Sequence, residues 1–162
     1  MNPDVSQFSI SGVVTFRVIT LCDQRSAPEV VAAYFCAPRG EVITNHELYG
    51  GMVAEIELET SSFKAAYSDM PSVERHVLHP DTAAKIEGFR FDQWPELARL
   101  AEEVHGSFQG IFSVGWDFVY TPDGFRLLEG NTLWGLHPGL FLGKTAYVSK
   151  AFEMLHAKAQ AT

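Results

Sequence analysis

The hydrophobic positions in the first half of the chain predict a series of β-strands. Two runs rich in β-branched and aromatic residues, 13–21 and 29–37, flank the polar segment 22–28, which is typical of a hairpin connection. Apolar and acidic side chains alternate over 52–58, which indicates a strand with one face in solvent. Residues 63–78 keep neither the helical nor the strand period, and we interpret them as a loop with a possible short strand.

The second half of the chain predicts two helices and two further strands. Asp92 can cap a helix that ends near Gly106, and apolar residues at helical spacing predict a terminal helix over 145–159. The predicted strands cover 111–120 and 125–131. Because strands outnumber helices and pair locally, the predicted fold class is α+β, with an antiparallel sheet packed with helices on at least one face.

Charge and composition exclude several classes of function. The chain has 162 residues and a net charge of −8, so it lacks the basic surface that binds nucleic acids or anionic membranes. It contains no repeat or long linker, and we expect residues 1–162 to form a single domain. No apolar stretch approaches the ~20 residues of a membrane span and the N-terminus is unlike a signal peptide, so we expect a cytoplasmic protein. Cys22 and Cys36 are interpreted as buried free thiols.

The hairpin predicted at 111–131 has a register that can be worked out from its turn. Residues 122–124, Pro-Asp-Gly, favour a three-residue loop with a bulge at the glycine, which places Thr121 opposite Phe125. A two-residue turn would shift the pairing by one position and move every side chain to the other face. The predicted location of the functional side chains therefore depends on this register.

Under the three-residue turn, Asp117 lies opposite Glu129 and Gly115 lies opposite Asn131. Since alternate residues of a strand share a face, Asp117, Glu129 and Asn131 all project from one side of the hairpin. The other side carries residues that can enter the core: Val114, Trp116, Phe118 and Leu128. With a two-residue turn Asp117 would instead pair with Leu128, and the two acids would point to opposite faces.

The residue types on this face are those of a magnesium site. Facing carboxylates repel each other unless a proton or a cation lies between them. Two carboxylates and the Asn131 amide are hard oxygen ligands of the kind that Mg²⁺ binds, together with water and nucleotide phosphates. Gly115 and Gly130, inside the strands, indicate a close approach by backbone or ligand. The alternative is that Asp117 and Glu129 are solvated residues on an exposed face of the sheet.

At these residues the sequence resembles the sugar-transfer-associated ATP-grasp family. The hairpin matches the family pattern of Gly-Trp-Asp, a short Asp-Gly turn and Leu-Leu-Glu-Gly-Asn, at 115–117 and 127–131. Three further segments match in the same order: the strand 15–20 with Arg17, Asn45 followed by Gly50 and Gly51, and 79–82, His-Pro-Asp-Thr. The resemblance implies the fold of the C-terminal ATP-grasp subdomain, with ATP and Mg²⁺ as cofactors.

The resemblance also implies a role for individual residues. The implied metal ligands are Asp117, Glu129 and Asn131. The implied contacts of nucleotide phosphate or of an acyl phosphate are Arg17, which is also the implied catalytic residue, and Asn45, Gly50 and Gly51. Without the family, Arg17 is equally typical of an ion pair and Asn45 of a local backbone hydrogen bond.

The resemblance covers nearly all of this chain but only the C-terminal half of the family's ATP-grasp unit. We therefore expect the chain to carry one half of a nucleotide site and to lack the N-terminal nucleotide subdomain. In an intact ligase of this kind, ATP activates a carboxylate as an acyl phosphate, which an amine or another nucleophile then attacks. The family name implies sugar or surface-polymer metabolism, and the carboxylate and amine substrates are unidentified.

Other functions remain open at the level of sequence. The chain could be a non-catalytic remnant or interaction module that dimerises or recruits a partner through apolar surface, for which the candidates are Trp134, Leu136, Leu140 and Phe141; their other interpretation is core packing. A small hydrolase using Asp117 and Glu129 as acid and base would need surroundings that separate their pKa values. A zinc site at His76 and His79 lacks the ligand spacing of a zinc motif.

Overall fold

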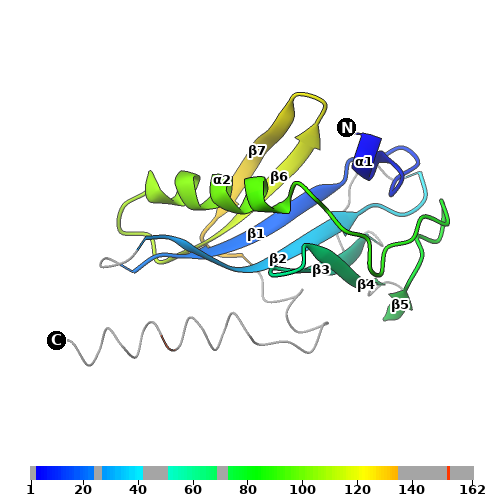
Figure 1. Ribbon diagram of the computed structural model, residues 1–162, viewed down its shortest axis with the longest axis horizontal. Coiled ribbons are helices and arrows are strands. Elements are labelled where there is room, and N and C mark those ends of the chain that lie inside the picture. Colours follow the sequence, from blue (N-terminus) through cyan, green and yellow to red (C-terminus); the bar gives the residue numbers. More distant parts are fainter. Residues whose placement is uncertain (1–2, 24–26, 42–50, 69–72, 135–152, 154–162) are drawn as a thin grey trace.

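The fold is known from a computed structural model (Figure 1), which describes residues 3–23, 27–41, 51–68, 73–134 and 153. The strands are β1 (Thr15–Leu21), β2 (Glu29–Ala37), β3 (Met52–Glu57), β4 (Ser62–Ser68), β5 (Glu74–His76), β6 (Ser113–Thr121) and β7 (Gly124–Asn131). The helices are α1 (Pro3–Ser6) and α2 (Trp94–Gly106). Among the described residues, strands therefore outnumber helices, and the predicted α+β class is confirmed.

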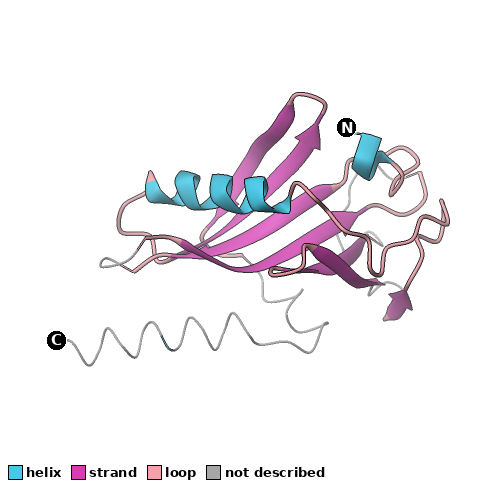
Figure 2. Ribbon diagram, viewed as in Figure 1, coloured by secondary structure: helices cyan, strands magenta, loops and turns pink. Residues whose placement is uncertain are grey.

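The strands form one antiparallel sheet whose centre brings together distant parts of the chain. Its order is β5-β4-β3-β2-β1-β6-β7, so the first five strands form a meander and the β6–β7 hairpin returns to pair with β1. The chain makes this return through α2, which lies across one face of the sheet (Figure 2). Strand β1 consequently lies between β2 and β6, and its side chains have neighbours from both halves of the sequence.

The sequence predicted most strands close to their observed positions, but the segment interpreted as a loop with a possible short strand contains two strands, β4 over 62–68 and β5 over 74–76. The reason is a β-bulge: the register between β3 and β4 shifts between Ala54 and Ile56, and the neighbouring Ala65 and Ala66 are both buried. Two consecutive buried residues break the alternation by which a strand is recognised.

The start of α2 also differs from the prediction. The helix begins at Trp94 with Gln93 at the cap position and no side-chain capping bond. Asp92 instead accepts a hydrogen bond from Arg90, with Nε and Oδ1 2.9 Å apart. A proline in the first turn sets the helix start without a capping side chain, since proline is favoured there by its fixed φ. The predicted helix over 145–159 lies outside the described residues except for residue 153.

The core lies between α2 and the sheet and is rich in aromatic side chains. Five fully buried phenylalanines from the N-terminal segment, three strands and the loop before α2 pack together: Phe8, Phe16, Phe35, Phe63 and Phe91. The Phe16 and Phe91 rings are stacked with their centroids 4.6 Å apart. Burying each such side chain contributes about 1.5–3 kcal/mol, so together these rings stabilise this face of the sheet.

A buried chain of hydrogen bonds joins α2 to the centre of the sheet. His105 Nε2 lies 3.0 Å from the carbonyl oxygen of Ile111 and donates to it, and Nδ1 lies 2.7 Å from the Thr20 hydroxyl oxygen, with which it shares a second hydrogen bond. Thr20 in turn accepts the indole N–H of Trp116 at 2.8 Å. These hydrogen bonds fix β6 against β1 and α2, and β6 carries Asp117 of the candidate site.

Candidate functional site

The candidate site lies on the sheet face opposite α2, where β1 presents Arg17. Phe16 and Val18 point into the core, so Arg17, between them, projects from the other face. Its direct neighbours in the sheet are Tyr34 on β2 and Asp117 on β6. Cross-strand partners share a face, so this pairing sets a row of polar side chains across the centre of the sheet.

Arg17 and Asp117 form a bidentate ion pair. Arg17 Nε lies 2.8 Å from Oδ1 of Asp117, and Nη2 lies 2.6 Å from Oδ2. The Asp117 side chain is only 11% exposed and that of Arg17 is 26% exposed, so the pair is largely shielded from water. Two parallel charge-assisted bonds hold the carboxylate in one orientation, which a single bond would not do.

Glu129 extends the row onto β7. It pairs directly with Asp117 and, unlike Asp117, is exposed to solvent. The Asn131 amide donates to Glu129 Oε1 at 2.9 Å. This bond is the main cause that lowers the pKa of Glu129, and the charge of Arg17 acts in the same direction. The arrangement favours an ionised Glu129 beside Asp117.

The predicted pairings at the site are confirmed, but the predicted turn is wrong. Thr121 pairs with Gly124 and not with Phe125, so the register next to the turn is that of a two-residue connection. A bulge between Asp117 and Phe118 then shifts the register by one residue and restores the pairing of Asp117 with Glu129.

Leu128 is the extra residue in this bulge. It is 57% exposed and does not enter the core as predicted, whereas Val114, Trp116 and Phe118 do. A bulged residue is left out of the ladder, so it no longer follows the alternation of its strand.

Gly115 and Gly130, inside the hairpin strands, make room for tryptophan side chains of the chain itself. A Cβ at Gly130 would lie 2.4 Å from Cζ3 of Trp116, its direct partner on β6. A Cβ at Gly115 would lie 2.9 Å from the Cβ of Trp134. The close approach that the glycines indicated is therefore accounted for by these packed rings.

Trp134 borders the candidate site on the Arg17 face. Its indole N–H donates to the Ser113 hydroxyl at 3.0 Å, and its ring packs against a small apolar cluster that includes Ile19 and Tyr34. This supports the core-packing interpretation of Trp134. The other members of the predicted apolar patch, Leu136, Leu140 and Phe141, lie outside the described residues.

The remaining residues predicted to contact nucleotide are only partly described. Asn45 and Gly50 lie outside the described residues. Gly51 is buried just before β3, beyond the Ala37–Met52 end of the β2–β3 ladder, whereas Tyr34 is at the other end. The structure therefore brings Arg17, Asp117, Glu129 and Asn131 together but does not bring Gly51 beside them.

His79, from the segment 79–82 that resembles the family, has a structural role. Its side chain is buried, with Nε2 donating to the Pro38 carbonyl oxygen at 3.1 Å and Nδ1 accepting from the backbone N–H of Asp81 at 3.3 Å. Burial lowers the pKa of His79, which favours this neutral form. With both ring nitrogens bonded to backbone, His79 holds two loops together and is not arranged as a zinc ligand.

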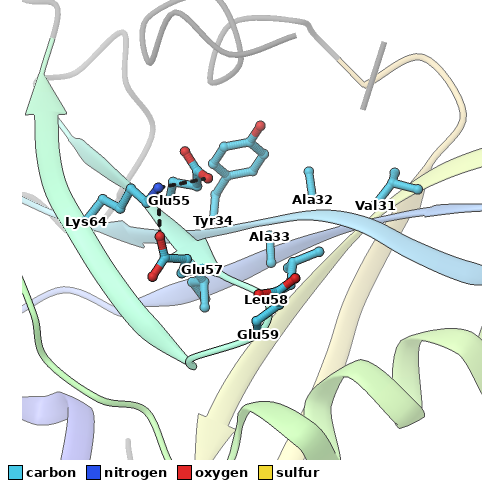
Figure 3. Close-up of a pocket in the computed structure, with 10 residues that line it drawn as sticks. Val31, Ala32, Ala33, Tyr34, Glu55, Glu57, Leu58, Glu59 and Lys64 are labelled. Atoms are coloured by element: carbon cyan, nitrogen blue, oxygen red, sulfur yellow. Dashed lines mark ion pairs between the residues drawn. The ribbon is translucent and has the colours of Figure 1, made fainter. Parts of the chain in front are cut away.

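Sequence reasoning missed a pocket on the same face, between β2 and β3 (Figure 3). The ladder between these strands ends at Tyr34 and Glu55, and beyond this point a pocket of about 290 Å³ opens. Lys64 lies between Glu55 and Glu57, with its Nζ 3.9 and 3.0 Å from the respective carboxylate oxygens. Tyr34, which pairs with Arg17, lines this pocket, so the pocket adjoins the Arg17 row. The alternating acids of 52–58 were the signal available in the sequence.

The donors in the row fit magnesium better than a zinc-type metal. Within the described residues, no group of three or more His, Cys, Asp and Glu side chains is arranged to hold a metal ion. Asp117, Glu129 and Asn131 supply two carboxylates and one amide oxygen. Magnesium usually takes only one or two protein carboxylates, with waters and substrate phosphates in the other positions, so these residues suffice for it.

Comparison with known proteins identifies the family. The family model described as sugar-transfer associated ATP-grasp matches residues 1–148. The chain belongs to this family. The ATP-grasp chain matches no curated protein and no solved structure at a significant level.

The architecture of the sheet around Arg17 agrees with membership in the ATP-grasp family. An antiparallel sheet with a helix on one face and a polar row on the other is consistent with an ATP-grasp-type ATP-binding domain. None of the helices in the described part of this ATP-grasp chain is long and apolar enough to cross a membrane.

Proposed function

We propose that this chain is the magnesium-and-phosphate-binding half of an ATP-grasp ligase. The observation that carries the proposal is the side-by-side placement of Asp117, Glu129 and Asn131 on one sheet face, next to Arg17. The family membership supports ATP as the nucleotide. The proposed reaction transfers the γ-phosphoryl group of ATP to a carboxylate, giving an acyl phosphate and ADP, after which an amine or other nucleophile displaces phosphate.

Each residue of the row has a distinct proposed task. Asp117, Glu129 and Asn131 would hold magnesium, which when bound neutralises phosphate charge. Arg17, next to Asp117 in the row, presents a fixed positive charge to the transferring phosphoryl group. Asn45, Gly50 and Gly51 are proposed phosphate contacts by family membership alone. The acceptor chemistry, a role in sugar or surface-polymer metabolism and a cytoplasmic location are proposed on the same basis.

Calorimetric titration of ATP tests this function directly. We expect heat of binding when magnesium is present and none when EDTA replaces it, because the carboxylates contact the metal and not the phosphates. Glu129→Gln should abolish the magnesium-dependent heat, while Glu96→Gln, an exposed acid on α2, should leave it unchanged. Equal heats for wild type and Glu129→Gln would contradict the metal assignment.

A second candidate function is favoured by the exposed strand edge at β7. In the described part of the sheet, β7 is an edge strand, and it exposes Leu127 and Leu128. An exposed edge with apolar side chains can pair with the same edge of a second copy. We would then expect a dimer in sedimentation velocity that Leu128→Lys converts to a monomer. A wild-type monomer at all concentrations would exclude this alternative.

A further inference from the structure

The ion pair between Arg17 and Asp117 affects whether the site binds a free metal cation or a cation that is already bound to phosphates. Both oxygens of Asp117 are bonded to the guanidinium, at 2.8 and 2.6 Å, and the carboxylate is mostly buried. A cation that approaches Asp117 therefore meets a carboxylate that is already neutralised and oriented. Cross-strand neighbours lie about 5 Å apart, so a cation between Asp117 and Glu129 is also repelled by the adjacent guanidinium.

The net charge of the row attracts a free cation and a cation bound to polyphosphate to different extents. The two carboxylates and one guanidinium leave a single net negative charge, which attracts a divalent cation only weakly. A magnesium–triphosphate complex is itself an anion, so its phosphates are attracted by the positive charge of Arg17 while its metal meets Glu129 and Asp117. The guanidinium thus opposes the binding of one ligand and favours the other.

We propose that Arg17 is a selectivity residue, which holds Asp117 so that the site takes a divalent cation bound to a polyphosphate in preference to the free cation. This inference rests on the proposed function, since it requires that Asp117 and Glu129 hold a metal. Arginine suits the task better than lysine, because its planar fork engages both carboxylate oxygens at once and keeps its charge at every relevant pH.

The position of Arg17 in the sheet gives this residue the selectivity role. Strand β1 is the only described strand that pairs with β6 on the side away from β7, and its register places Arg17 directly opposite Asp117. The other carboxylate of the row, Glu129, accepts a hydrogen bond from the neutral Asn131 amide. Removing the Arg17 charge should therefore change the electrostatics at Asp117 most and those at Glu129 less.

The test measures free Mn²⁺ and Mn²⁺–ATP as separate ligands of the purified chain. Mn²⁺ replaces Mg²⁺ because its unbound form is quantified by electron paramagnetic resonance. We expect Arg17→Met to bind free Mn²⁺ about tenfold or more tightly than wild type, and to bind Mn²⁺–ATP about tenfold or more weakly. Arg17→Lys, which keeps the charge, should resemble wild type toward the free cation. Arg99→Met, which removes a positive charge from α2, should change neither affinity.

The outcomes separate this inference from the proposed function. If free Mn²⁺ binds in a manner that Glu129→Gln abolishes, but Arg17→Met binds it no more tightly, the selectivity role is wrong and the metal site stands. If no variant shows Glu129-dependent Mn²⁺ binding, the proposed function itself fails. A purely structural Arg17 would weaken both ligands together. Should Arg17→Met not fold, as judged by its circular dichroism, Arg17→Gln gives the same decision with a neutral polar side chain.

Discussion

The two faces of strand β1 differ in burial, polarity and charge. On one face Phe16 is fully buried beneath α2 and stacks on Phe91. On the other face Arg17, the next residue, is ion-paired with Asp117 and borders a pocket with acidic and basic side chains. The apolar face supplies the packed core, whereas the polar face carries charges whose removal should destabilise the fold less than loss of a core ring. This difference predicts that substitutions on the two faces change the free energy of unfolding by different amounts.

The largest effect is expected on the apolar face. Phe16→Ala removes a fully buried ring from the aromatic core and should lower the free energy of unfolding by about 3–5 kcal/mol, as measured by urea denaturation. Arg17→Met leaves Asp117 without its ion-pair partner and should cost less, about 1–3 kcal/mol. If Arg17→Met destabilised the protein more than Phe16→Ala, the polar face would be a structural element and the comparison would be wrong.

A smaller effect is expected where a ring of the apolar face lies against a strand glycine. Gly130→Ala would place a Cβ 2.4 Å from the Trp116 ring, whose indole N–H is held by Thr20. The forced displacement should cost about 1–3 kcal/mol and shift the tryptophan fluorescence. Gly106→Ala is the matched control, since its Cβ would meet only Pro28 Cγ at 3.9 Å. An unchanged unfolding midpoint for Gly130→Ala would show that the ring can turn aside.

The difference between the two faces could be predicted in part from the sequence. Runs rich in β-branched and aromatic residues correctly predicted β1 and β2, and the two hairpin strands were also predicted. The spacing of Asp117, Glu129 and Asn131 correctly placed all three on one side. The turn from which that placement was derived is not the one that forms, however. The turn does not set the register at the site, because the bulge at Leu128 intervenes between them.

The pairing of β1 with β6 could not be predicted from local patterns. Arg17 and Asp117 are 100 residues apart in the sequence, and hydrophobic periodicity does not specify which strands become neighbours. The resemblance to a family suggested that both residues belong to one site, but not that they bond to each other. For the same reason the pocket beside Tyr34 was missed, since it depends on where the ladder between β2 and β3 stops.

The smallest predicted effect is a pH dependence of stability that arises from a loop far from the Arg17 row in the sequence. Burial lowers the pKa of His79 below its ordinary 6.5, and this effect outweighs the hydrogen bond to the Pro38 carbonyl and the charge of Asp81, which both raise it. The unfolded state therefore binds more protons between the two pKa values. The stabilisation is complete above pH 6.5 and is lost as the pH falls toward the folded-state pKa.

One such proton changes the free energy of unfolding by at most about 1.4 kcal/mol per pH unit. Urea denaturation of wild type and His79→Gln between pH 7.5 and 5 measures the difference in slope, and we expect the variant to lose less stability on acidification. His76→Gln is the necessary control, because burial also lowers the pKa of His76 and its Nε2 lies 2.9 Å from the Ser68 hydroxyl. If His76→Gln alone flattened the pH profile, the acid sensitivity would lie at the β4–β5 edge of the sheet. A profile flattened by His79→Gln would place it at the contact between Pro38 and the 79–82 segment, where the loop that follows β2 is held.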